Sequence, residues 1–136
     1  MSSQRTTGTA TSRARTVRNA IRKPTKARLM LTGPSGSGKT WTALEIAEVL
    51  APGGVHVFID SEPSDDENTA AELYADQFRF QLIDWRFPPY DPRDLAATIR
   101  DLGLSPDRPD VLIIDSASPF WRGSGGTLDI AGGQYQ

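Results

Sequence analysis

Residues 28 to 40 read RLMLTGPSGSGKT, and this stretch decides the fold that the sequence predicts. Arg28–Thr32 is a short apolar run that ends at a glycine and a proline, so it predicts a buried strand. From Lys39 onward, apolar residues recur at the spacing of one helix face until Pro52, namely at Ala43, Ile46, Ala47 and Leu50. A strand, a glycine-rich loop and a helix are therefore expected in succession.

The loop in this stretch fits the pattern GxxxxGK[ST] and is called the P-loop below (residues 33–40). Its glycines let the backbone wrap closely, so that consecutive N–H groups can point at phosphate oxygens. The start of the following helix adds its own free N–H groups and the positive end of its dipole. We expect Lys39 to reach the β- and γ-phosphates of a nucleotide and the Thr40 hydroxyl to ligate Mg²⁺. The predicted nucleotide contacts are Gly33, Pro34, Ser35, Gly36, Ser37, Gly38, Lys39, Thr40 and Trp41.

Further along the chain, strand and helix patterns alternate. Strands are predicted at Val55–Asp60, Phe80–Ile83 and Val111–Asp115. A capping-box pattern at Ser64 and Glu67 predicts a helix whose apolar face comprises Ala71, Tyr74, Ala75 and Phe78. This alternation predicts an α/β fold with a mostly parallel sheet.

Another helix is predicted from the N-cap Asp91 and the following proline to Gly103. The stretch Ser116–Gln136 is rich in Gly and Ser, and we expect no regular element there.

Carboxylates follow two of the predicted strands. Asp115 ends the run VLII, and in a parallel sheet that edge also borders the P-loop, so Asp115 can hold Mg²⁺ through a water molecule. The earlier strand is followed by Glu62, which could orient or deprotonate an attacking water. Asp60 is expected to be a supporting acid in the loop. The alternative interpretation is a solvated acidic turn made of Asp60, Glu62, Asp65, Asp66 and Glu67.

Composition limits the remaining possibilities. The 136 residues include no Cys and a single His, which excludes a disulfide scaffold, a cysteine nucleophile and a multi-histidine metal site. Residues 1–44 carry nine basic and no acidic residues, whereas residues 45–136 carry the other six basic and all 17 acidic ones, so the two parts have formal charges of +9 and -11. Residues 1–26 are predicted to be a basic disordered tail, with a nucleic-acid-contacting arm and a transit peptide as alternatives. No apolar run approaches the ~20 residues of a membrane span, so no membrane contact is expected.

Three motifs, GPSGSGKT, FIDSE at 58–62 and VLIIDS at 111–116, follow one another along the chain. In this order and at these intervals, the sequence resembles RecA-like P-loop ATPases of the AAA/RecA superfamily, especially compact phage-type members, from Arg28 to Ser118. The resemblance implies a three-layer P-loop NTPase fold with ATP and Mg²⁺ as cofactors. It implies that Lys39 and Thr40 contact phosphate and Mg²⁺, and that Glu62 is the water-activating base. Asp115 is then the residue that holds magnesium through water.

The resemblance also implies a biological setting. Mg-dependent ATP hydrolysis would serve phage DNA recombination or replication in the cytoplasm of a bacterial or phage-infected cell, with single- or double-stranded DNA as a partner and a homo-oligomer as the working form. Residues 27–118 would form the ATPase core and residues 119–136 a Gly-rich remainder. Such folds place a further strand between the P-loop strand and the strand of Asp115, so we expect the chain to be incomplete at its C-terminus.

Two other functions stay open at this point. GPSGSGKT is also close to the loop of guanylate kinases, although no cluster of arginines follows the P-loop here to bind a second nucleotide. A nucleotide- or nucleic-acid-binding module without turnover is the other alternative, because the basic tail offers a sequence-independent contact for phosphate backbones. Aromatic residues that could stack on bases are Trp41, Trp85, Phe120 and Trp121.

Overall fold

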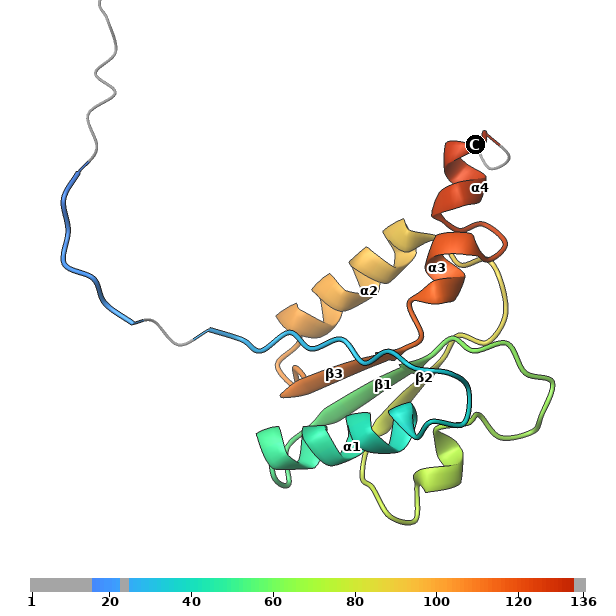
Figure 1. Ribbon diagram of the computed structural model, residues 1–136, viewed down its shortest axis with the longest axis horizontal. Coiled ribbons are helices and arrows are strands. Elements are labelled where there is room, and N and C mark those ends of the chain that lie inside the picture. The colour runs from blue at the N-terminus through green and yellow to red at the C-terminus, as the bar shows by residue number, and fades with distance from the viewer. Residues whose placement is uncertain (1–15, 23–24, 134–136) are drawn as a thin grey trace, which may run out of the picture. The chain divides into compact units, whose positions relative to one another are not determined.

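The computed structural model describes residues 16–22 and 25–133. The chain divides between Met30 and Leu31 into two units. The described residues of the first unit form neither helix nor strand, and residues 1–15 and 23–24 of the predicted tail lie outside the described residues. Every helix and strand of the described chain lies in the second unit (Figure 1). None of these helices is both long and apolar enough to span a bilayer.

A parallel sheet of three strands forms the centre of the second unit. The strands are β1 (His56–Asp60), β2 (Gln81–Asp84) and β3 (Val111–Asp115), and their order is β2-β1-β3. The register pairs Asp60 with Asp84 on one side and with Asp115 on the other, so that a carboxylate ends each strand at the same edge of the sheet. The predictions of three strands and of an α/β fold with a parallel sheet are confirmed.

Helices lie on both faces of this sheet, with α1 (Lys39–Leu50) on one side and α2 (Pro92–Leu104) on the other (Figure 1). The helix α2 begins as predicted, since the Asp91 side chain accepts a hydrogen bond from the backbone N–H of Arg93 at 2.8 Å. A single 3₁₀ turn, η1 (Glu72–Tyr74), and the short helices α3 (Ser118–Arg122) and α4 (Thr127–Ala131) complete the elements of the described residues.

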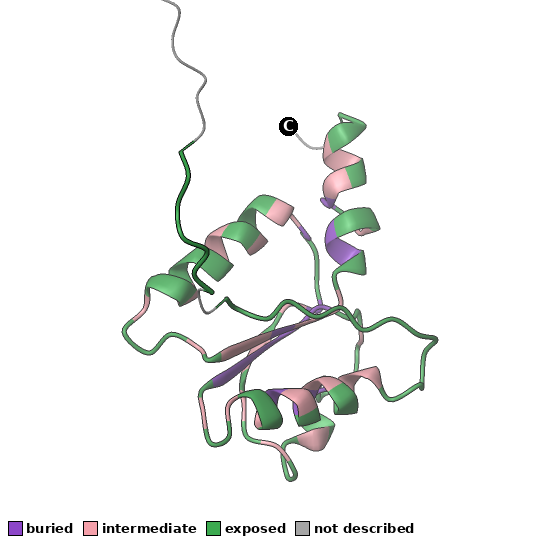
Figure 2. Cartoon of the chain, turned by 60° about the vertical axis from the view of Figure 1, so that its left-hand side comes forward, coloured by how far each residue is buried: buried purple, intermediate pink, exposed green. Residues whose placement is uncertain are grey.

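The core lies between β1 and α1. Every residue of β1 is buried, which is typical of the central strand of a parallel sheet covered on both faces (Figure 2). On the α1 side, Phe58 packs in a cluster with Leu44, Ala47, Ala71 and Ile113. Burying side chains of this size contributes about 1.5–3 kcal/mol each, so this cluster fixes α1 against the sheet.

The predicted strand at Arg28–Thr32 is wrong. This segment is described and forms no strand, and Leu29 and Met30 are 66% and 86% exposed. A strand requires a neighbour to pair its N–H and C=O groups. The sheet of the described residues consists of β2, β1 and β3, and none of these strands pairs with this segment. Without such a neighbour, the apolar run keeps a solvated backbone.

The predicted helix after Ser64 is also wrong, because only the turn η1 forms there. Local and tertiary contacts compete with the helix for its backbone groups. The Ser64 hydroxyl accepts the N–H of Asp66 at 3.1 Å, and the carbonyl of Asp66 accepts a guanidinium N–H of Arg86 at 2.6 Å. The N–H of Ala71 donates to the side chain of Asp60 at 3.3 Å. The capping box that does form lies five residues later, between Thr69 and Glu72.

The expectation of no regular element in Ser116–Gln136 is wrong too, since α3 and α4 form there. Each has five residues, which is too short to show a helical period in the sequence. Pro119 lies in the first turn of α3, where a proline is tolerated. The Thr127 hydroxyl at the start of α4 donates to the carbonyl of Phe120 at 3.0 Å and so links the two helices.

Candidate nucleotide-binding site

The P-loop precedes α1 as an open turn. Residues 33–38 are exposed, and Gly36 and Gly38 have φ values of +75° and +82°, a region in which a side chain is disfavoured. Gly38 is the N-cap of α1, so the helix begins at Lys39 as predicted. The first N–H groups of a helix have no partner within it, and here they begin at a solvent-accessible loop. This arrangement can receive a phosphate group.

Lys39 extends back over the loop. Its Nζ donates a hydrogen bond to the carbonyl of Pro34 at 2.8 Å, and the N–H of Ser37 donates to the same carbonyl at 3.3 Å. The ammonium group therefore lies over the turn whose N–H groups would surround a phosphate. The contact of Lys39 with phosphates stays a prediction.

Thr40 and Asp115 meet although 75 residues separate them in the chain. The Thr40 hydroxyl donates to Asp115 Oδ2 at 2.5 Å, and both residues are half-buried. Packing of α1 against β3 creates this contact, since it places the first turn of the helix beside the end of the strand. A hydroxyl and a carboxylate, both predicted magnesium residues, thus lie side by side.

The hydroxyl oxygen of Thr40 and the carboxylate oxygen of Asp115 suit Mg²⁺ better than they suit a metal ion whose ligands all come from the protein. Among the residues that the structure describes, no group of three or more His, Cys, Asp or Glu could hold a metal ion. Mg²⁺ commonly takes only one or two protein oxygens, with phosphates and waters as its other ligands. Thr40 and Asp115 are therefore suited to an ion that arrives together with a nucleotide.

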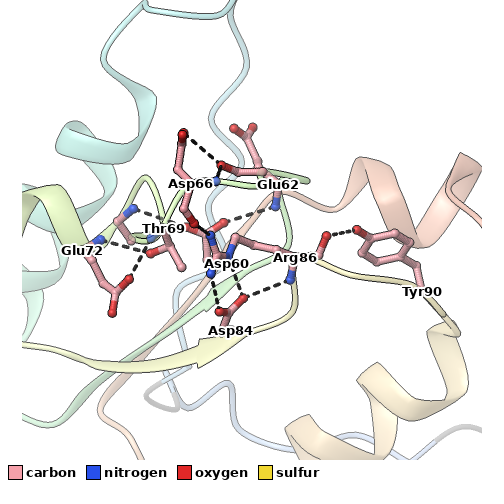
Figure 3. A network of polar contacts seen from close by, with 10 residues as sticks. Asp60, Glu62, Asp66, Thr69, Glu72, Asp84, Arg86 and Tyr90 are labelled. Carbon is pink, nitrogen blue, oxygen red and sulfur yellow. Dashed lines mark hydrogen bonds and ion pairs between the residues drawn. The ribbon is translucent and has the colours of Figure 1, made fainter.

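Glu62 lies near the start of the segment that leads from β1 to η1, called the acidic loop below (residues 61–71). Its N–H donates to Asp60 Oδ1 at 3.2 Å, while its carboxylate points away from this network (Figure 3). Partial desolvation, and then the charges of Asp115 and Asp60, raise the pKa of the exposed Glu62 side chain, and Lys39 opposes this shift. Glu62 therefore lies within electrostatic reach of both predicted phosphate and magnesium residues.

A hollow of about 310 Å³ lies beside this carboxylate. It is lined by Leu73 of η1 and by residues of the acidic loop, namely Glu62, Pro63, Ser64, Asp66, Glu67, Asn68 and Ala70. The alternative interpretation of a solvated acidic turn thus describes the outer part of the loop, from Asp65 to Asn68, where the residues are exposed.

Asp60 differs from its acidic neighbours because it is 2% exposed. Its carboxylate accepts the N–H groups of Glu62 and Ala71 and a hydrogen bond from the Thr69 side chain. Burial raises the pKa of Asp60, and these three hydrogen bonds oppose the shift. Asp60 therefore connects the two ends of the acidic loop, which agrees with the supporting role predicted for it.

Three residues that were not predicted from the sequence complete this network, namely Thr69, Asp84 and Arg86 (Figure 3). The only local signal was the spacing of Asp84 and Arg86, and the same Asp-x-Arg spacing recurs at Asp91 and Arg93, where the arginine side chain is 70% exposed. Spacing alone could not tell the buried arginine, Arg86, from the exposed one, Arg93.

The aromatic residues considered for base stacking mostly pack against other rings. Trp41 makes edge-on contacts with Tyr74 and Phe78, with ring centroids 5.6 and 4.8 Å apart. Trp85 contacts Phe120 in the same manner at 5.0 Å. The remaining one, Trp121, is 58% exposed.

We compared the chain with protein-family models, curated protein sequences and solved structures. No family model, no curated protein and no solved structure matches it. The resemblance to RecA-like ATPases therefore rests on the sequence motifs alone.

Proposed function

We propose that this chain binds Mg²⁺–ATP at the P-loop and hydrolyses it as a RecA-like ATPase. The observation that carries the proposal is the hydrogen bond between Thr40 and Asp115. Two motifs far apart in the sequence meet at the first turn of the helix after a GxxxxGKT loop, where a P-loop enzyme needs its magnesium residues.

Each group has a separate role in this proposal. The N–H groups of the P-loop and the ammonium of Lys39 bind the phosphates and offset their negative charge. Thr40 and Asp115 would hold the magnesium ion, which would neutralise the negative charge that develops on the phosphate oxygens. Glu62 accepts a hydrogen bond from the attacking water, so that a lone pair of the water oxygen points at the terminal phosphorus. The raised pKa of Glu62 moves it towards the range in which a carboxylate is an effective base.

We extend the proposal to a step on DNA in phage recombination or replication. Its support is the RecA-like order of the three motifs and the +9 charge of residues 1–44. Deleting residues 1–26 is expected to weaken DNA binding and to reduce its salt dependence.

Titration calorimetry with Mg²⁺–ATP tests the central proposal, with release of inorganic phosphate as the second measurement. Lys39→Ala should weaken ATP binding roughly 10- to 100-fold, because it removes a hydrogen bond from a charged donor. Lys26→Ala removes the same charge outside the P-loop and should leave the affinity unchanged. Equal affinities of Lys39→Ala and the wild type would contradict the proposal. ATP binding without phosphate release would support the non-hydrolysing module, and transfer of phosphate to a nucleotide would support a kinase.

A further inference from the structure

Arg86 makes a set of contacts that the proposed hydrolysis does not yet use. Its Nε and one terminal nitrogen bind the two carboxylate oxygens of Asp84 at 3.0 and 2.8 Å. The other terminal nitrogen donates to the carbonyl of Asp66 at 2.6 Å. Only 9% of the side chain is exposed. A single guanidinium thus joins the end of β2 to the middle of the acidic loop (Figure 3).

The backbone around Arg86 is itself held at several points. The carbonyl of Arg86 accepts the hydroxyl of the buried Tyr90 at 2.5 Å. One residue earlier, the N–H of Trp85 donates to the carbonyl of Asp60 at 2.7 Å. The backbone that carries the guanidinium is therefore fixed, so the contact of the guanidinium with Asp66 restrains the acidic loop.

The acidic loop is fixed at several places along its length. At its first residue, the N–H of Ser61 donates to the carbonyl of Asp115 at 2.9 Å. Asp60 holds the loop at Glu62 and, near its other end, at Thr69 and Ala71. Between these ends, the contact from Arg86 to Asp66 is the one that ties the loop to β2. Glu62 is held by Asp60 and lies between the fixed residues Ser61 and Asp66, so its main chain has little freedom to move away from the sheet edge.

We propose that Arg86 is a positioning residue for Glu62, which it keeps at the P-loop by holding the acidic loop on the end of β2. This inference rests on the proposed role of Glu62 in hydrolysis. Arg86 does not contact the nucleotide in this proposal, and it acts through the conformation of residues 61–71 alone.

The pair of Asp91 and Arg93 provides a matched control in the same chain. It has the same spacing and a similar fork of hydrogen bonds, with a closest contact of 2.6 Å between Arg93 and Asp91. Its arginine is 70% exposed and lies at the start of α2, away from the acidic loop in sequence. A substitution that acts only by weakening an Asp-x-Arg pair should have the same effect at both places.

The experiment compares Arg86→Lys with Arg93→Lys in the full chain. Lysine keeps the charge but cannot make the fork to Asp84 and reach Asp66 at once. We expect Arg86→Lys to lower kcat by about 10- to 100-fold with KM for ATP within about twofold of wild type, since a misplaced group affects the reaction more than binding. Arg93→Lys should match wild type. An unchanged kcat in Arg86→Lys, or an equal loss of kcat and of ATP affinity, would overturn the inference.

Hydrogen exchange separates this inference from the proposed hydrolysis. If the wild type releases no phosphate, the proposed ATPase function fails, but the loop can still be followed through the amides of Glu62, Asp66 and Ala71. These should exchange several times faster in Arg86→Lys than in Arg93→Lys, because their restraint is lost. Equal exchange rates in the two variants would overturn the role of Arg86 in holding the loop.

A second pair of variants covers the case in which Arg86→Lys folds poorly. Thr69 is fully buried, and its hydroxyl links Asp60 to the N–H of Glu72. Thr69→Val removes the hydroxyl and keeps the shape, whereas Thr69→Ser keeps the hydroxyl. We expect Thr69→Val to lower kcat with little change in KM, and Thr69→Ser to keep kcat close to that of the wild type. Equal kcat values in these two variants would show that the network does not position Glu62.

Discussion

The P-loop and the acidic loop both meet the sheet at the ends of its strands, but they hold their backbones differently. In the P-loop, the short contacts converge on one carbonyl, that of Pro34, and residues 33–38 are exposed. In the acidic loop, side chains bind the N–H groups of Glu62, Asp66 and Ala71. The first loop stays exposed to solvent, whereas the second uses its backbone donors to stay in one conformation.

This difference corresponds to two tasks at one site. A loop that surrounds phosphates needs free N–H groups, and glycines supply the left-handed turns that aim them. A loop that carries a single reactive carboxylate needs a fixed main chain instead, because the direction of that group decides the rate. Variants in each loop test whether the P-loop binds phosphate and the acidic loop orients Glu62.

The largest expected effect follows from Glu62→Gln. Glutamine keeps the size of the side chain but cannot accept a proton, so phosphate release should fall by about 100-fold or more while ATP binding stays unchanged. The control is Glu67→Gln, which removes the same charge from the exposed part of the acidic loop and should leave turnover intact. If both variants hydrolyse ATP like the wild type, Glu62 is not the base.

Thermal stability gives a second measurement on the same variant. Since the pKa of Glu62 is raised in the folded chain, its ionised form is less favourable there than in the unfolded chain. Removing the charge should therefore leave the melting temperature at pH 7 unchanged or slightly higher. A lower melting temperature of Glu62→Gln would mean that the carboxylate stabilises the loop and is not directed at a ligand.

The pH dependence of kcat/KM, which reports the pKa of the free chain, is the next effect in size. A base works only when ionised, so kcat/KM should fall about tenfold per pH unit once the pH drops below the pKa of Glu62. Burial, Asp115 and Asp60 place that pKa above the usual value of about 4.3 for glutamate. A profile of phosphate release against pH measures it, with Glu67→Gln as a variant that should keep the profile. An acid limb centred below the usual value would contradict the geometry around Glu62.

These two loops also differ in how far the sequence could predict them. The P-loop and the start of α1 follow from neighbouring residues, since glycines set the turn and the pattern after Lys39 sets the helix. The sequence analysis expected Asp115 beside the P-loop because a strand would precede that loop in the sheet. That strand does not form, and the packing of α1 against β3 brings Thr40 to Asp115 instead. The acidic loop could not be predicted, since its conformation depends on Asp60 and Arg86, which lie outside it.

Tertiary contacts account for the other differences. The pattern of Ser64 and Glu67 indicated a helix, yet the partners that hold this backbone lie as far away as Arg86. The apolar run Arg28–Thr32 indicated a strand, and whether such a run forms one depends on a neighbouring strand rather than on its own residues. Local propensity is a weak guide wherever the partner is distant.

A smaller effect on stability is expected from substituting two glycines, Gly38 at the start of α1 and Gly103 near the end of α2. Gly38→Ala places a side chain at a φ of +82°, with no other atom within 4 Å, so the cost is that of the backbone alone, about 1–2 kcal/mol. Gly103→Ala, in the last turn of α2, also meets open space but without the positive φ, and should stabilise the chain by up to about 1 kcal/mol. Urea unfolding of both variants measures the contrast. Equal changes would contradict the left-handed turn at the P-loop.

The smallest expected effect concerns Asp84, which fixes the acidic loop through Arg86. The side-chain hydrogen bonds from Arg86 lower the pKa of Asp84 in the folded chain. The carboxylate therefore adds stability that is fully present above its unfolded pKa of about 3.9 and is lost as the pH falls through the lower folded value. Because 42% of the Asp84 side chain is exposed, solvent screening limits this contribution to less than about 1 kcal/mol.

Asp84→Asn tests this contribution by urea unfolding at pH 7 and near pH 2.5. The variant should be less stable than wild type at pH 7, and the difference should shrink at pH 2.5, because Asp84 is then neutral in the unfolded chain. A difference that stays constant between the two pH values would show that packing rather than charge holds Arg86 to β2. The acidic loop would then be fixed by shape, and its hold on Glu62 would not depend on pH in the acid range.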